Sequence, residues 1–145
     1  MQKLSKPILL KLLIPIGYGV LACIYFTYSA AHEQITTHHV IGMLTTVIAF
    51  VFWITARIQL GNSFTLAPEA KKLVQSGIYS KLRHPVYYFS LLAVAGIVIF
   101  AWSNYMFIAL GILLIVELVR IKQEEKILLQ KFGNDYVEYK RSTWF

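Results

Sequence analysis

Residues 85–119 read PVYYFSLLAVAGIVIFAWSNYMFIALGILLIVELV and hold two apolar runs, Val86–Ala101 and Tyr105–Val119. A short polar interruption, Ser103-Asn104, separates the runs. Because a lipid environment offers no partner to unpaired backbone groups, helices are the expected structure for both runs. The pattern therefore predicts an antiparallel helical hairpin that turns at residues 102–104.

Two further apolar runs precede the hairpin, Ile8–Tyr28 and Val40–Leu60, and each is long enough to span a bilayer core of about 30 Å. The chain is 57% hydrophobic and 14% charged, whereas a soluble domain carries roughly a quarter charged residues. The sequence predicts an all-α, polytopic integral membrane protein with about four transmembrane helices in a single domain, 1–145. Residues 1–60 hold two N-terminal spans, and residues 61–145 hold a connector, the C-terminal helical hairpin and a tail.

The basic residues indicate which side of the membrane each connector occupies. With four crossings, all 14 Lys and Arg residues fall on or near one side, and the connector 29–39 and the hairpin turn hold none. The positive-inside rule then places both termini and the connector 60–85 in the cytoplasm. We expect a multi-pass protein of the plasma (inner) membrane, and we interpret the net charge of +7 as topology, with no nucleic-acid partner.

Other motifs favour plainer interpretations. Gly17–Ala22 has the letters of a dinucleotide fingerprint, but it lies within an apolar run with no strand before it. His32, His38 and His39 are typical of a solvated outer loop, so we expect no metal, and the single Cys23 excludes an intramolecular disulfide. A basic start before an apolar run also fits a signal peptide, but the length of the run favours a retained helix.

The segment Arg83-His84-Pro85 predicts a helix start at the cytoplasmic surface. Proline is favoured at the first helical position, and it disfavours helical geometry at the preceding residue. The free N–H groups and the positive end of the helix dipole can there hold a carboxylate. Gly77, shortly before, suits a tight backbone turn.

The hairpin geometry predicts which residues face this helix start. Pro85 lies 18 residues before a turn centre at Ser103, and 18 residues after that centre is Ile121. Both arms rise about 1.5 Å per residue. Residues 83–85 should therefore be level with residues 120–125.

Charged residues line one face of the second arm at this level. Arg120 and Glu124 are four apart, and Glu117 continues the same stripe toward the membrane. The predicted site combines a helix N-terminus, a histidine, an arginine and carboxylates. A plainer interpretation is that Glu124 and Glu125 belong to a solvated helix end and that Arg83 anchors to lipid phosphate.

Two segments resemble the paired signatures of the isoprenylcysteine carboxyl methyltransferase and phospholipid methyltransferase superfamily. The first is LVQSGIY at 73–79 followed by RHPVY at 83–87, and the second is RIKQEE at 120–125 with the aromatic and glycine positions up to Tyr139. The resemblance covers roughly residues 57–141. It implies an integral-membrane methyltransferase that uses S-adenosylmethionine in a pocket facing the cytoplasm, with no Rossmann domain and no metal.

The resemblance also implies roles for individual residues. The implied cofactor-binding residues lie in the connector, at the helix start and on the facing arm: Leu73, Val74, Gly77, Tyr79, Arg83, His84, Pro85, Tyr87 and Glu124. Arg120 matches the arginine that orients the substrate carboxylate in the prenylcysteine branch. If the acceptor is instead an amine, Glu117 or Glu125 would accept its proton. The chain departs from the family at Lys71, often a histidine, and at Phe89, often a small residue.

The expected reaction is methyl transfer to an amphiphilic, lipid-like acceptor at the cytoplasmic membrane surface, most simply carboxyl O-methylation. A methyl sulfonium is already activated, so positioning and exclusion of water would account for most of the catalysis. N- or S-methylation of a phospholipid or small molecule is an alternative. A non-catalytic membrane protein that uses the hairpin for assembly is another. Membrane lipids are the expected surroundings in each case.

Overall fold

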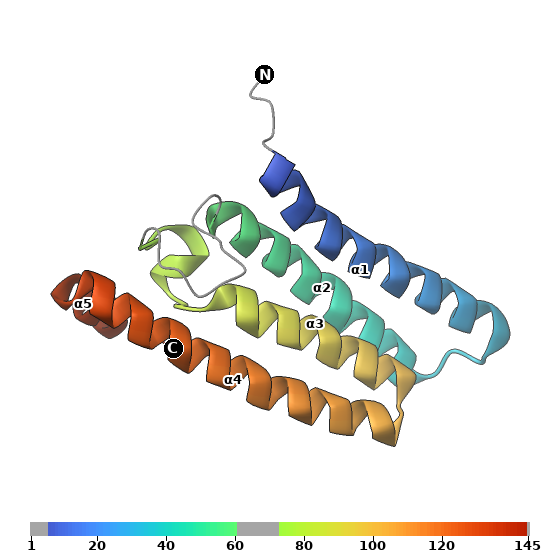
Figure 1. Cartoon of the computed structure of the whole chain (residues 1–145). Coiled ribbons are helices and arrows are strands. Elements are labelled where there is room, and N and C mark those ends of the chain that lie inside the picture. The colour runs from blue at the N-terminus through green and yellow to red at the C-terminus, as the bar shows by residue number, and fades with distance from the viewer. Residues whose placement is uncertain (1–5, 61–72, 145) are drawn as a thin grey trace.

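The computed structural model describes residues 6–60 and 73–144, with side chains from residue 19 onward within these ranges. Every described element is helical, which confirms the predicted all-α class. Figure 1 shows long helices lying side by side, with the end of α2, the start of α3 and the C-terminal helix at one end of the bundle. The elements are α1 (Lys6–His32), α2 (Thr37–Leu60), η2 (Gly77–Ser80), α3 (Pro85–Ala101), α4 (Asn104–Phe132) and α5 (Asn134–Ser142).

The predicted hairpin is confirmed at its turn. α3 ends at Ala101, and the next residue, Trp102, adopts a left-handed conformation with φ 46° and ψ 41°. Its N–H donates to the carbonyl of Val98 at 2.9 Å, and an extended Ser103 then leads into α4. The chain reverses within two residues, so α4 returns alongside α3 (Figure 1).

Helices α2 and α3 pack through glycine at very short range. A Cβ atom built on Gly42 would lie 2.5 Å from the backbone nitrogen of Phe100, and one on Gly96 would lie 2.6 Å from the backbone nitrogen of Thr46. The Thr46 hydroxyl donates to the carbonyl of Gly42 at 2.9 Å and approaches that of Ala93 at 3.3 Å. Small residues at such positions let two helix backbones approach closely.

We therefore expect Gly42→Ala to lower the free energy of unfolding by about 2 kcal/mol, because the added methyl must push two backbones apart. Gly111→Ala on α4 is the matched control, since nothing lies within 4 Å of a Cβ built there; it should be neutral or stabilise by up to about 1 kcal/mol through helix propensity. Unfolding of both variants in the same detergent measures the difference. Equal stability would contradict the close α2–α3 contact.

Two described helices, α2 and α4, are long and apolar enough to cross a membrane. α4 has no buried residue, and it exposes Ile108, Ile112, Ile115 and Val119. A core helix of a soluble protein would bury such side chains, and contiguous apolar surface of this kind suits lipid tails. α3, with 17 residues, is shorter.

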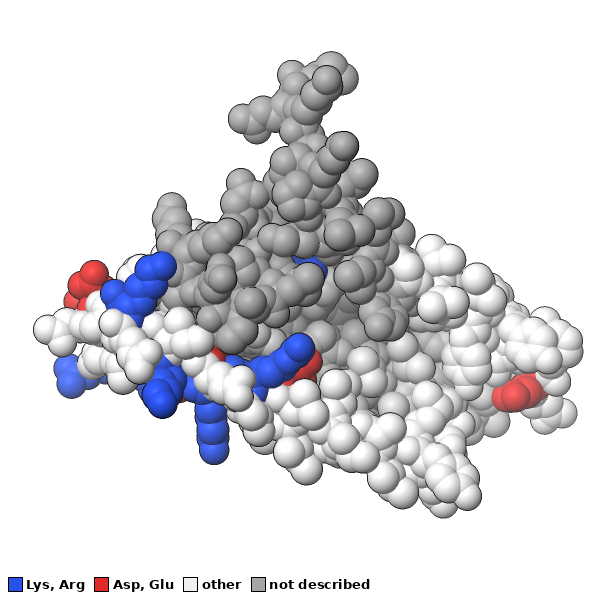
Figure 2. All heavy atoms as spheres, viewed as in Figure 1, with Lys and Arg blue, Asp and Glu red and all other residues white. Residues whose placement is uncertain are grey.

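Charge collects at one end of the molecule. Figure 2 shows Lys and Arg side chains gathered over the end that carries α5, while most of the described surface beyond it is uncharged. This distribution agrees with the sequence pattern that we interpret as topology.

The C-terminal segment differs from the simple tail that the sequence suggested. After α4, Gly133 adopts φ 52°, and α5 folds back against the bundle. Tyr136 and Tyr139, three positions apart on α5, are buried. The segment is therefore a packed element of the fold.

Candidate active site

The site begins at the N-terminus of α3. Pro85 occupies the first turn and His84 is the N-cap residue with φ −127° and ψ 51°, as the sequence predicted. The carbonyl of His84 accepts the N–H groups of Tyr87 and Tyr88 at 3.1 and 3.2 Å. The His84 residue is only 4% exposed, so its ring is fixed where the helix starts.

Helix α4 supplies two carboxylates to the histidine. His84 Nδ1 lies 3.4 Å from Glu124 Oε2, and His84 Nε2 lies 3.6 Å from Glu125 Oε1. The structure therefore confirms the prediction that residues 83–85 lie level with residues 120–125. This meeting places a buried imidazole directly against acidic side chains.

Glu125 is held by several cations. Arg83 Nε lies 3.3 Å from its Oε1, and Lys140 Nζ lies 3.0 Å from its Oε2. Arg83 also donates through NH1 to the carbonyl of Lys140 at 3.2 Å. Glu125 thus links the connector, α4 and α5.

Two tyrosines approach the same carboxylates. Tyr79 in η2 is buried with Ala56 and Val86. Burial, with the nearby charge of Glu124, raises the pKa of Tyr79 well above its usual range, so its hydroxyl remains a neutral donor. Tyr87, on the first turns of α3, has its ring centroid 6.0 Å from that of His84. Aromatic surface therefore flanks the ionic cluster.

The turn at Gly77 is fixed from α2. Gly77 has φ +63°, and a Cβ there would meet the side-chain amide of Gln59. Gln59 Oε1 accepts the N–H of Ile78 at 2.8 Å. The sequence analysis did not identify Gln59. The feature that could have indicated it is a polar amide between apolar residues in the last turn of an apolar run.

Several buried polar atoms of this region have no hydrogen-bond partner among the described residues. Buried polar groups are nearly always satisfied in native proteins, so such a set fits a bound polar ligand. Three of these atoms, Arg83 Nε, His84 Nε2 and Glu124 Oε2, lie in the ion pairs described above but form no hydrogen bond. The other three are Tyr79 OH, Glu117 Oε2 and Tyr136 OH.

The remaining predicted residues lie around this cluster. Leu73 and Val74 are half-buried, and Val74 packs against the cluster that contains Tyr79. Glu117 is half-buried on α4, whereas Arg120 is exposed on the same helix. Phe89 stacks on Phe52 of α2 at 5.1 Å. Lys71 lies outside the described residues.

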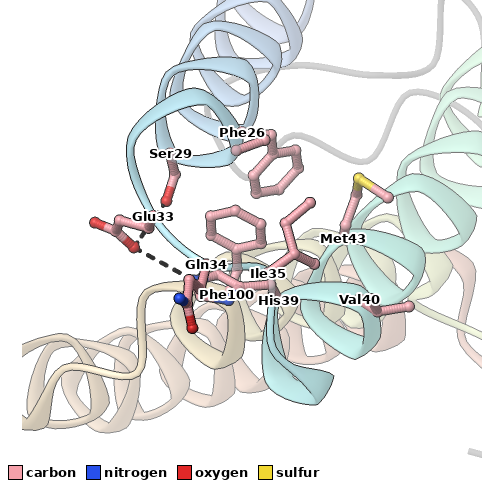
Figure 3. A pocket seen from close by; sticks show the side chains of 10 residues that line it. Phe26, Ser29, Glu33, Gln34, Ile35, His39, Val40, Met43 and Phe100 are labelled. Carbon is pink, nitrogen blue, oxygen red and sulfur yellow. Dashed lines mark hydrogen bonds and ion pairs between the residues drawn. The ribbon is translucent and has the colours of Figure 1, made fainter.

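A small cavity of about 50 Å³ lies away from this cluster, next to the loop between α1 and α2 (Figure 3). It is lined by Phe26, Phe100 and the ring of His39, among others. His39 Nδ1 accepts the N–H of Thr36 at 3.1 Å, and Nε2 lies 3.5 Å from Glu33. The histidine therefore serves the local loop, and residues 6–60 and 73–144 contain no cluster of three or more His, Cys, Asp or Glu suited to a metal ion.

Comparison with known proteins supports the resemblance. The family described as "Phospholipid methyltransferase" matches residues 37–135, which contain the first signature and the RIKQEE motif of the second. No solved structure is significantly similar to the chain.

Curated relatives carry the name protein-S-isoprenylcysteine O-methyltransferase. The Dictyostelium discoideum protein is 30% identical over 72% of this chain and 46% of its own length, and the Saccharomyces cerevisiae protein is 31% identical over 81% and 51%. The Arabidopsis thaliana form B is 30% identical over 94% of this chain and 71% of its own length. Apart from this plant relative, the chain spans about half the length of these proteins. The family match and these relatives confirm the resemblance: the chain belongs to the phospholipid methyltransferase family.

Proposed function

We propose that this chain is an integral-membrane methyltransferase that binds S-adenosylmethionine between η2, the start of α3 and the C-terminal half of α4. The observation that carries the proposal is the contact of buried His84 with Glu124 at 3.4 Å, near a buried Tyr79 hydroxyl that has no hydrogen-bond partner among the described residues. The names of the relatives support a methyltransferase. In this proposal four helices cross the inner membrane, and both termini and the site face the cytoplasm.

The residues at the site fit the chemistry of the cofactor. Glu124 accepts hydrogen bonds from its amine or ribose hydroxyls, and the start of α3 with His84 holds its carboxylate. Tyr79 and Tyr87 provide aromatic faces for the adenine ring or for the positive charge of the sulfonium. When bound, S-adenosylmethionine supplies a methyl group that is already activated for transfer.

Connector residues complete the proposed cofactor site. Leu73 and Val74 offer half-buried apolar surface, and Gly77 allows the turn that Gln59 fixes. Arg83 acts through Glu125, to which it is paired.

The proposed acceptor is an amphiphilic carboxylic acid. Arg120 is exposed on the helix that also carries Glu124, and a guanidinium can hold a carboxylate through two parallel bonds and aim one oxygen. The apolar face of α4 offers a lipid tail a surface beside the site. The relatives' names, which specify O-methylation of an isoprenylcysteine, agree with such an acceptor.

One observation favours a second candidate, N-methylation of an amine. Glu117 has a buried carboxylate oxygen with no hydrogen-bond partner among the described residues, which would suit a proton acceptor. Glu125 suits that role less well, because its contacts with Arg83 and Lys140 stabilise the carboxylate in its charged form. In both candidates we assign Glu125 a positioning role.

Cofactor binding decides whether the chain is a methyltransferase. Protein purified in detergent should show saturable thermal stabilisation by S-adenosylhomocysteine, equivalent to about 2.7 kcal/mol at a ligand concentration of 100 Kd. Adenosine, which lacks the amino-acid moiety expected at α3, should stabilise far less. Absence of stabilisation at millimolar S-adenosylhomocysteine would favour a non-catalytic assembly protein.

The chemical stability of the product separates the two acceptor classes. Membranes containing the protein are incubated with methyl-labelled S-adenosylmethionine, and the lipid-soluble product is treated with mild base. We expect release of the label, because carboxyl methyl esters hydrolyse under these conditions. A base-stable label would instead indicate methylation of nitrogen or sulfur.

A further inference from the structure

The loop of residues 77–83, here called the cofactor loop, is bound by the C-terminal helix. The hydroxyl of Tyr139 on α5 donates to the backbone carbonyl of Tyr79 at 2.6 Å. Tyr139 is 5% exposed, and burial raises its pKa to about 12, although nearby Arg83 lowers it. The hydroxyl therefore stays protonated at neutral pH and donates in a protected environment.

Two more bonds join the same segments. The backbone N–H of Trp144 donates to the carbonyl of Lys81 at 2.9 Å. In the other direction, Arg83 NH1 donates to the carbonyl of Lys140 at 3.2 Å. All three bonds end on a backbone carbonyl, so they fix the path of the chain.

α5 is also anchored to α4. Lys140 Nζ lies 3.0 Å from Glu125 on α4, and Tyr136 is 2% exposed. The loop, by contrast, contains only one turn of 3-10 helix, a form with weak hydrogen-bond geometry. Its shape must therefore come from its neighbours, Gln59 on one side and α5 on the other.

We propose that α5 is a latch that holds the cofactor loop in its binding shape, with Tyr139 and the backbone of Trp144 as positioning residues. The inference rests on the proposed function, since the latch matters for activity only if Tyr79 and His84 bind the cofactor. Neither Tyr139 nor Trp144 needs to touch the cofactor for this role.

Tyr139→Phe removes the donor and keeps the ring. Losing one buried hydrogen bond should raise the Kd for S-adenosylhomocysteine about tenfold. In labelled membranes the KM for S-adenosylmethionine should rise similarly, while kcat at saturating donor changes less than twofold. Backbone amides of residues 77–83 should exchange faster with deuterium, whereas those of α2 and α3 keep their rates. Tyr105→Phe is the matched control, because Tyr105 is 85% exposed at the hairpin turn.

A second pair of variants tests the backbone bond alone. Trp144→Pro removes the N–H that donates to Lys81, whereas Trp144→Ala keeps it and removes the exposed ring, whose centroid lies 5.9 Å from Lys81 Nζ. Thr143 already has φ −107° and ψ 154°, the extended geometry that a residue before proline prefers. We expect the proline variant to behave like Tyr139→Phe and the alanine variant to stay within twofold of the unmodified protein.

Loop exchange and S-adenosylhomocysteine binding together separate the latch from the proposed function. Faster exchange in residues 77–83 together with weaker S-adenosylhomocysteine binding in Tyr139→Phe and Trp144→Pro supports the latch. Unchanged loop exchange, or faster exchange with unchanged affinity, overturns it. Absence of binding by the unmodified protein instead overturns the proposed function, and it is seen before any variant is made.

Discussion

Glu124→Gln will weaken binding of S-adenosylhomocysteine about 30-fold, because a hydrogen bond to a charged group contributes about 1.5–3 kcal/mol and the amide keeps only the shape. Glu124 Oε2 is buried 3.4 Å from His84 Nδ1, yet it forms no hydrogen bond with any described residue. Isothermal titration in detergent measures the change. Glu138→Gln on the exposed surface of α5 makes the same chemical change away from the site and should leave the Kd unaltered.

His84→Ala extends this prediction to the other side of the contact. Removing the buried ring leaves Glu124 and Glu125 without their imidazole partner, so cofactor affinity should fall at least as far as in Glu124→Gln. The double variant should lose much less than the sum of the two single losses, because the residues act as a pair. Fully additive losses would show that each residue contributes independently.

Arg120→Ala should leave the Kd for S-adenosylhomocysteine within twofold and lower methyl transfer about 100-fold, because the acceptor loses the group that aims it. The exposure of Arg120, against the burial of His84, is the structural basis for separating the two roles. Arg120→Lys should recover only part of the rate, since an ammonium cannot make the two parallel bonds of a guanidinium.

Lys122→Ala is the matched control for Arg120. Lys122 is exposed on the same helix two positions away, so its replacement removes a positive charge without changing the face that carries Glu124. Equal losses of rate in the two variants would show that the loss of positive charge, and not a specific contact of Arg120, lowers the rate. Joint loss of binding and turnover in Arg120→Ala would contradict the division of roles.

The meeting of the two signature segments could be predicted from the sequence. In a helical hairpin, residues equally far along the chain from the turn lie at the same level on the two arms. Once the turn lies at residues 102–104 and Pro85 starts a helix, the rise per residue alone brings His84 level with Glu124. These features depend on local chemistry and on straight helices, and the structure confirms them.

The contacts that hold the site could not be predicted in this way. Gln59 reaches Gly77 only through the register of α2 against η2. α5 is short and polar, and its buried Tyr136 and Tyr139 carry no apolar period long enough to distinguish a packed helix from a solvated tail. The sharing of Glu125 among Arg83, His84 and Lys140 likewise depends on tertiary placement.

The backbone contact of Gly42 with Gly96 couples the packing of α2 against α3 to the position of His84. Gly96 lies 12 residues beyond His84 on an uninterrupted helix, a separation of about 18 Å. A larger side chain at Gly42 or Gly96 would tilt α3 and displace its N-terminus, where His84 lies. Inactivating substitutions should consequently accumulate at a crossing remote from the chemistry.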